Sequence, residues 1–266
     1  MASVEHCLYC FEALASHLEK RPGLPLKEIQ RSWPKYAKTL GDGKDDGKKL
    51  PPAMQRLAEP SSDSASASSS SSVSLAAETP ATSTDSLPDG NAAVAESPLF
   101  VTWNTVSPRS GHRSLRGCIG TFEAQELEDG LSSYALTSAL HDTRFPPVEA
   151  SELPSLEVAV TLLTDFEDAD DAMDWTLGVH GLRISFVHQG RRYGATYLPD
   201  VAVEQEWTKE ETLVSLMRKA GWMGSKTKWR DVELKVVRYQ GKKESLEYGE
   251  YRKWADWFKK NKAKSG

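Results

Sequence analysis

The sequence predicts an α+β fold built around a mainly antiparallel sheet. Segments with the alternating apolar pattern of strands and segments with the periodicity of helices are both present. Strand-like segments that follow one another across short polar turns dominate over evenly repeated strand–helix–strand units. Short turns join antiparallel neighbours, because a parallel pair needs a long crossover. A chain of 266 residues is also long enough to bury a substantial core.

The first helix is predicted over residues 4–20. Apolar side chains recur there at intervals of three and four residues, and Ser3 with His6 forms a start signal. Pro22 and Gly23 end the pattern.

Two cysteines in this helix have the spacing of a metal or redox motif. Cys7 and Cys10 lie on its apolar side together with Phe11, and no second cysteine pair is present to complete a tetrahedral site. We therefore assign both thiols to core packing and expect no metal.

Residues 41–97 have the composition of a disordered insertion. The segment begins with glycine and charged residues, and ten of the fourteen residues from 61 to 74 are serine. Aromatic residues are absent from Leu40 to Leu99. Such a segment buries too little apolar area to offset the entropy lost on ordering.

The next elements are two strands and a helix. Residues 99–104 and 115–122 read as strands, with a polar loop between them that turns the chain. A helix over 127–140 carries its larger apolar side chains on or near one face, and the segment 144–147, which ends in two prolines, stops it.

Three further strands and two helices complete the prediction. Residues 157–163 alternate in polarity, and the strands 178–187 and 193–198 bracket a glycine-containing hairpin turn. A helix over 209–220 directs Leu213, Leu216 and Met217 inward. A strand over 232–239 and an aromatic helix over 248–260 follow, and residues 261–266 are predicted to be a basic flexible tail.

Composition excludes several classes of function. The 33 Lys and Arg against 38 Asp and Glu give a net charge of -5, whereas a general nucleic-acid binder normally has a basic excess. No run approaches the roughly 18 apolar residues of a membrane span, and the N-terminus lacks the pattern of a secretory signal. Three cysteines are too few for a disulfide framework. We expect an intracellular protein with reduced thiols.

The segment Arg116-Gly117-Cys118-Ile119-Gly120 is the strongest candidate for chemistry. The glycines let the backbone pass close to another group, and Arg116 offers donors suited to a carboxylate or phosphate. Cys118 is a candidate nucleophile if a neighbour lowers its pKa. The alternative is that Cys118 is a small buried apolar residue.

Two histidines are available as general bases. His141, with Asp142 as its orienting residue, stands at the end of a predicted helix, where it could equally cap the last carbonyls. His180 begins a predicted strand, where a structural hydrogen bond is the competing interpretation. The sequence carries no common nucleotide-binding, metalloprotease or serine-hydrolase motif, so the cofactor stays unknown at this point.

Residues 115–122 resemble the signature of the AMMECR family. The resemblance continues, in the family's order, through segments 98–103, 136–147, 152–168, 174–186 and 195–207, and the opening helix is similar as well. It implies one domain, formed by residues 1–40 and 98–260, of two unequal subdomains with the 116–120 motif facing the cleft between them. The serine-rich stretch is then an insertion within this domain.

For function, the resemblance implies little chemistry. The family's prokaryotic members are associated with Memo-like and radical-SAM proteins, and its eukaryotic members with the nucleus or cytoplasm, without an agreed activity. Two hypotheses therefore stay open. In one, Cys118 acts with His141 or His180 on a small anionic substrate; in the other, the same cleft binds a ligand or a protein peptide without catalysis. The ligand-binding candidates are Arg116, Gly117, Ile119, Gly120, Asp142 and Arg144.

Overall fold

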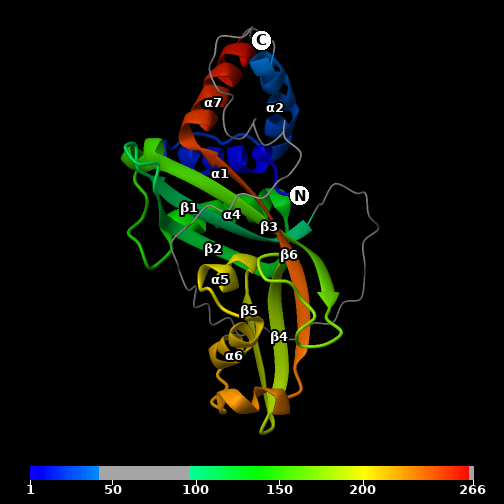
Figure 1. Cartoon of the computed structure of the whole chain (residues 1–266). Coiled ribbons are helices and arrows are strands. Elements are labelled where there is room, and N and C mark those ends of the chain that lie inside the picture. The colour runs from blue at the N-terminus through cyan, green and yellow to red at the C-terminus, as the bar shows by residue number, and fades with distance from the viewer. Residues whose placement is uncertain (42–95, 264–266) are drawn as a thin grey trace. The chain divides into compact units, whose positions relative to one another are not determined.

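The computed structural model describes residues 1–41 and 96–263. Its helices and strands, in chain order, are α1 (Val4–Leu18), α2 (Leu26–Gly41), β1 (Glu96–Val106), β2 (Arg113–Glu126), α4 (Leu127–Leu140), η1 (Ala150–Ser155), β3 (Leu156–Asp168), β4 (His180–His188), β5 (Arg191–Tyr197), α5 (Pro199–Glu204), α6 (Lys209–Lys219), η2 (Lys226–Asp231), β6 (Lys235–Glu247) and α7 (Tyr248–Lys262) (Figure 1).

The strands form one six-stranded sheet in the order β2-β1-β3-β6-β4-β5. The pairs β1–β3, β4–β5 and β4–β6 are antiparallel, with Trp103 opposite Val158 and Ile184 opposite Ala195. The predicted α+β fold with a mainly antiparallel sheet is therefore confirmed.

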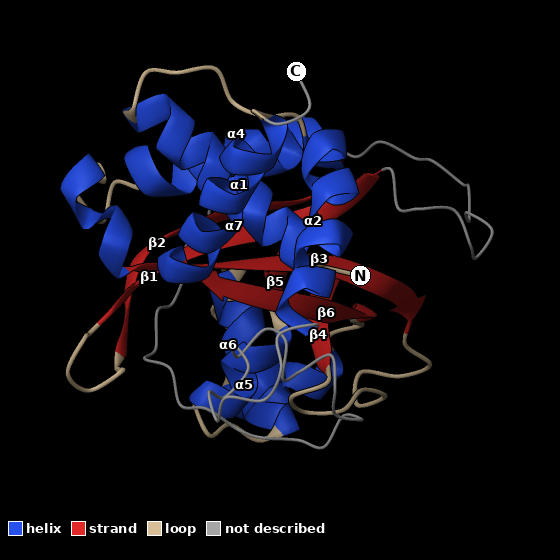
Figure 2. Cartoon of the chain, turned by 90° about the horizontal axis from the view of Figure 1, so that it is seen from above, coloured by secondary structure: helices blue, strands red, loops and turns tan. Residues whose placement is uncertain are grey.

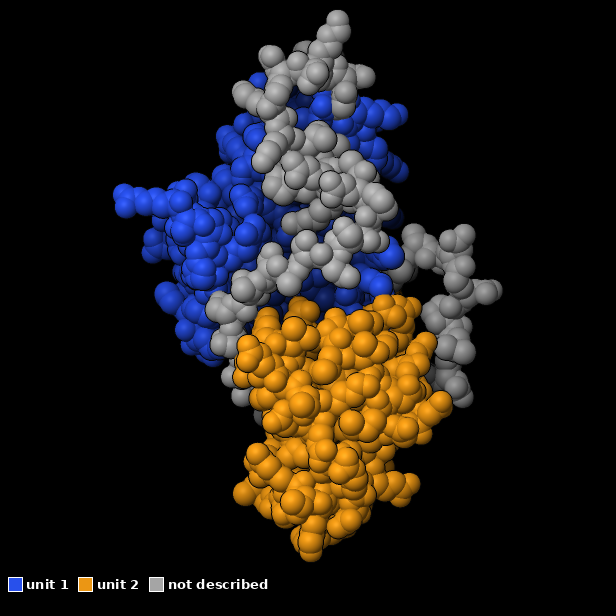
Figure 3. Space-filling model, in the orientation of Figure 1, with its two compact units in different colours: residues 1–68, 97–164, 241–266 blue, residues 69–96, 165–240 orange. Residues whose placement is uncertain are grey.

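The chain divides into two compact units, which Figure 3 colours separately. Among the described residues, the first unit contains 1–41, 97–164 and 241–263, and the second contains 96 and 165–240. Strands β1, β3 and β6 contribute residues to both units.

In the first unit, helices cover one side of the strands β1 to β3 (Figures 1 and 2). The apolar face of α1 is buried completely at Cys7, Cys10 and Phe11, and the Phe11 ring meets Trp103 edge to face at 5.1 Å. Trp103 also donates its indole N–H to the Ala135 carbonyl of α4 at 3.0 Å. The assignment of both α1 cysteines to the core is confirmed.

The second unit has its own core. Leu213, Leu216 and Met217 of α6 are fully buried, as their spacing predicts, and they pack in one cluster with Ile184 and Phe186 of β4. The β4–β5 hairpin turns at residues 189–190, where both backbone φ angles are positive.

Several elements differ from the prediction. Helix α2 was not predicted, although its apolar residues recur at helical spacing around an interior Pro34. The short helix α5 was also missed. Strand β6 begins three residues later than predicted and runs eight residues further. Helix α7 continues to Lys262, two residues beyond the predicted boundary.

Part of the predicted domain organisation lies outside the described residues. This applies to 42–95 of the predicted disordered insertion and to 264–266 of the predicted tail. In the described ranges, no helix is both long and apolar enough to cross a bilayer.

Candidate functional site

The motif Arg116–Gly120 lies in β2, which is an edge strand of the sheet. A Cβ atom added at Gly117 would lie 2.0 Å from the Ser138 carbonyl oxygen near the end of α4. A Cβ added at Gly120 would lie 2.4 Å from the Leu99 carbonyl oxygen in β1. Both glycines therefore allow backbone approaches that no other residue permits.

Asp142 and Arg144 bracket the backbone of Cys118. The Cys118 N–H donates to Asp142 Oδ2 at 2.9 Å, and Arg144 Nη2 donates to the Cys118 carbonyl oxygen at 3.1 Å. The two side chains also pair with each other through Arg144 Nε and Nη2, at 2.9 and 2.6 Å. At this residue the ion pair satisfies the edge-strand groups that a further strand would otherwise satisfy. We call Cys118, Asp142 and Arg144 the β2 corner.

The thiol of Cys118 faces the protein interior. Its residue is 8% exposed, and Sγ accepts a hydrogen bond from the Thr102 hydroxyl at 3.1 Å. Burial raises the pKa of this thiol, and the opposing effects of the Thr102 hydrogen bond, Arg144 and Lys243 do not reverse the direction. Cys118 is therefore held in its neutral, weakly nucleophilic form.

The Arg116 guanidinium is hydrogen-bonded to the segment that follows α4. Its Nε and Nη2 donate to the two Glu152 carboxylate oxygens at 2.8 and 3.0 Å. Nη1 and Nη2 donate to the carbonyls of Pro146 and Pro147. The guanidinium therefore ties β2 to the chain around the two prolines, and its side chain is 11% exposed.

The two predicted bases make structural hydrogen bonds. His141 is exposed at the C-cap of α4, where its backbone N–H donates to the Thr137 carbonyl. His180 belongs to the second unit, and its Nδ1 accepts a hydrogen bond from the Thr176 N–H at 2.9 Å. Within the described residues of the first unit, Cys118 Sγ has no histidine as a hydrogen-bond partner.

Ile119 is half-buried in β2, beside the corner. Sequence reasoning named the corner residues but missed Thr102 and Glu152, the partners of Cys118 and Arg116. Thr102 lies 16 residues from Cys118 and Glu152 lies 36 from Arg116, so only the strand pairing and the loop path bring them together. Among the described residues, no group of three or more His, Cys, Asp or Glu is placed to hold a metal ion.

Replacing Asp142 by asparagine is expected to destabilise the protein in a pH-dependent way. Chiefly through the hydrogen bonds from Arg144, the pKa of Asp142 is lowered from 3.8 to about 2. A lowered pKa in the folded state gives stability that is present above the unfolded pKa and is lost as pH falls through the folded one. Urea unfolding should show a loss of about 2 kcal/mol for Asp142→Asn at pH 7.

This difference from the wild type should stay constant down to about pH 4 and shrink towards pH 2. Glu123→Gln, at an exposed position of β2, should change stability by less than about 0.5 kcal/mol. A loss at pH 7 that persists unchanged at pH 2 would show that the Asp142 charge is not its source.

The chain is similar to several known proteins. A family model described as AMMECR1 matches residues 7–244. An uncharacterised protein of Arabidopsis thaliana is 48% identical over 159 residues, which are 59% of this chain and 74% of that protein. An uncharacterised protein of Schizosaccharomyces pombe is 44% identical over 154 residues, which are 58% and 77% of the two chains. The crystal structure of an uncharacterised protein from Pyrococcus horikoshii matches with 30% identity and a TM-score of 0.48, covering 60% of this chain and 80% of that one.

Proposed function

We propose, from the premise that this chain belongs to the AMMECR1 family, that it is a binding module which holds an anionic group of a small ligand or peptide at Arg144. The observation that carries the proposal is the state of Arg144 in the β2 corner. Asp142 and the Cys118 carbonyl fix its guanidinium, while 34% of the side chain stays exposed. Within the described residues, Arg144 Nη1 donates to no group.

A fixed arginine with a free edge suits a carboxylate or a phosphate. The planar guanidinium loses little rotational freedom when it is already held by Asp142, so binding an anion costs less entropy. Lys243 also acts electrostatically on Cys118 and so adds positive charge near the corner. The other motif residues have supporting roles: Arg116 holds the segment around Pro146, and the glycines allow the close approach of β2.

The same corner supports binding better than catalysis. A nucleophilic cysteine needs a base or a lowered pKa, whereas burial raises the pKa of Cys118. The enzyme hypothesis uses the same residues but requires Cys118 to react as a thiolate. The two hypotheses therefore differ in the chemistry of one atom, Cys118 Sγ.

Titration with succinate and with inorganic phosphate, followed by amide NMR, tests the binding proposal. Because the Cys118 and Arg144 amides both donate to Asp142, we expect their signals to shift saturably. Arg144→Gln should weaken binding by roughly tenfold or more, because the loss of a charge-assisted contact costs about 1.5–3 kcal/mol. Arg113→Gln, a control arginine in β2, the strand that contains Cys118, should leave binding unchanged. Shifts that are absent or insensitive to Arg144→Gln would contradict the proposal.

Alkylation of the three cysteines with iodoacetamide tests the catalytic alternative. We expect Cys118 to label slowly at neutral pH, with a rate midpoint above the reference thiol pKa of about 8.5. Cys7 and Cys10 are fully buried and serve as internal references. Cys118→Ala should leave anion binding intact. Fast labelling with a midpoint well below 8.5 would instead support the enzyme hypothesis.

We place this module inside the cell, in the cytoplasm or the nucleus. The three cysteines are free thiols, which suits a reducing compartment.

A further inference from the structure

A pocket of about 340 Å³ opens in the first unit, away from the residues of the β2 corner. It lies where the end of α7 faces α1 and the connection from α1 to α2. Its lining residues are Glu12, Arg21, Leu24, Ala255, Phe258, Lys259, Lys262 and Ala263. Small-molecule sites typically have volumes of about 300–1,000 Å³ with mainly apolar walls, so this pocket is at the lower end of their range.

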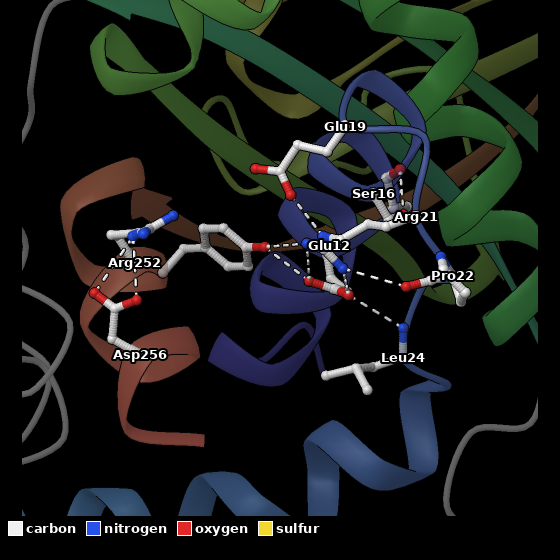
Figure 4. Close-up of polar contacts among 10 residues, drawn as sticks. Glu12, Ser16, Glu19, Arg21, Pro22, Leu24, Arg252 and Asp256 are labelled. Atoms are coloured by element: carbon white, nitrogen blue, oxygen red, sulfur yellow. Dashed lines mark hydrogen bonds and ion pairs between the residues drawn. The ribbon is translucent and has the colours of Figure 1, made fainter. Parts of the chain in front are cut away.

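The polar floor of the pocket is already satisfied. The Glu12 carboxylate accepts hydrogen bonds from Arg21, the Leu24 N–H and the Tyr251 hydroxyl (Figure 4). Arg21 in turn donates through Nε to Glu19, and through Nη1 and Nη2 to Glu12, the Pro22 carbonyl and Tyr251. These contacts leave the floor no free charge for a ligand, so a ligand's polar group must bind elsewhere.

The walls and the rim differ in character. Leu24, Ala255 and Phe258 form apolar walls, and all three are buried or half-buried. Of the three lysines in the last turn of α7, Lys259 and Lys262 line the pocket. Lys262 pairs with Glu28 at 3.1 Å and lies 5.6 Å from the Phe258 ring centroid. Lys259 is exposed, and in the part of the chain that the structure describes it has no hydrogen-bond or carboxylate partner.

A neighbouring pocket is less suited to an apolar molecule. It has a volume of about 440 Å³ and shares Arg21 and Leu24 with the first, but polar side chains such as Ser16, His17 and Glu128 contribute much of its lining. Only the first of these two pockets combines apolar walls with an unpaired cation at the rim, and we call it the α7 pocket.

We infer that the α7 pocket binds a small amphiphilic carboxylate. Its aliphatic or aromatic body would lie against Leu24, Ala255 and Phe258, and its carboxylate would pair with Lys259. The apolar walls supply the hydrophobic contribution, and the Lys259 ammonium supplies the charge complementarity. This site is independent of the anion site proposed at Arg144.

Octanoate is a suitable probe, because it combines an apolar chain with one carboxylate. In an amide NMR titration of the full chain, we expect saturable shifts at Leu24, Ala255 and Phe258. Lys259→Glu should weaken octanoate binding roughly tenfold, since it replaces an attraction at the rim by a repulsion. Lys260→Glu is the matched control, because Lys260 is an exposed neighbour of equal charge that does not line the pocket, and it should change affinity by less than about twofold.

Two further arms separate this inference from its competitors. Octanamide, which has the same chain without the charge, should bind to the wild type more weakly than octanoate does. Its affinity should be the same for the Lys259→Glu and Lys260→Glu variants. Arg144→Gln should leave octanoate binding unchanged, so a failure here is distinguishable from a failure of the proposed function. Equal weakening by Lys259→Glu and Lys260→Glu, or octanoate shifts spread over the surface, would overturn the inference. Circular dichroism melts should confirm that both lysine variants remain folded.

Discussion

Replacing Gly117 by alanine is expected to lower the free energy of unfolding by about 4 kcal/mol, near the upper end of single-substitution effects. The new Cβ would lie 2.0 Å from the Ser138 carbonyl oxygen and 3.0 Å from the Ser138 carbonyl carbon. Both atoms are backbone, so no side-chain rotation relieves the clash. Either β2 must move away from α4, or the last turn of α4 must unwind.

Gly249→Ala is the matched control for Gly117→Ala. A Cβ at Gly249 meets nothing within 4 Å, and the residue lies in the first turn of α7. Alanine there should stabilise the protein by about 0.5 kcal/mol, because it reduces the conformational freedom of the unfolded chain. Chemical denaturation of both variants makes the comparison. A Gly117→Ala variant with wild-type stability would show that β2 and α4 are not held as closely as the structure places them.

Displacement of β2 in Gly117→Ala should also reach the β2 corner. The Cys118 amide next to the substitution donates to Asp142, so its NMR signal and its exchange with solvent report the loss of this contact. We expect faster exchange of the Cys118 amide in Gly117→Ala and unchanged exchange in Gly249→Ala.

The helices with complete local signals were predictable from the sequence. The predicted range 127–140 coincides with α4, and the predicted start of α1 at Val4 is the observed one. In α1, the Ser3 N–H donates to His6 Nδ1 at 3.1 Å, so the start signal in the sequence has a physical counterpart. Each of these boundaries depends on residues within one or two turns of it.

Elements that depend on distant partners were less predictable. Strand β6 continues through polar residues such as Lys242, Lys243 and Glu244, which lack strand propensity. Strand β4 pairs with β6 only up to Gln240, and β3 is the other hydrogen-bonded neighbour of β6, so the strand is held by backbone pairing regardless of those side chains. In α2, Pro34 argues against a helix locally, but Ile29, Trp33 and Tyr36 are buried on one face and tertiary packing outweighs the local signal.

In the candidate site too, local features were predictable and contacts between distant residues were not. The unusual residue types of the 116–120 motif could be recognised in the sequence, and Asp142 and Arg144 were named with it. Their arrangement could not be recognised in the sequence. The contacts of Asp142 and Arg144 with the Cys118 backbone form only where the chain after α4 returns to the edge of β2. The hydrogen bonds from Arg116 to Glu152 likewise depend on the path of the chain after α4.

Replacing Glu12 by glutamine is expected to lower the free energy of unfolding by about 3 kcal/mol, the second largest effect. Glu12 is 2% exposed and accepts from the Arg21 guanidinium, the Tyr251 hydroxyl and the Leu24 N–H. It therefore ties α1 to the α1–α2 connection and to α7. Glutamine keeps the shape but loses the charge, and its amide N–H groups face the donors of Arg21 and Tyr251. The variant leaves buried donors without an acceptor, which is the costly way to break such a network.

Glu19→Gln is the control, because Glu19 binds the same guanidinium at 2.6 Å from an exposed position. Solvent screens that contact, so its loss should cost less than about 1 kcal/mol. Urea unfolding at pH 7 measures both variants, and equal losses would contradict a special role for the buried carboxylate.

A double-mutant cycle of Glu12→Gln with Tyr251→Phe isolates the link to α7. If Tyr251 stabilises the fold mainly by donating to Glu12, its removal should cost about 1–2 kcal/mol in the wild type and much less in the Glu12→Gln background. Additive losses would instead mean that the connection of α1 to α7 depends on apolar packing around Tyr251, with the carboxylate serving Arg21 and Leu24 alone.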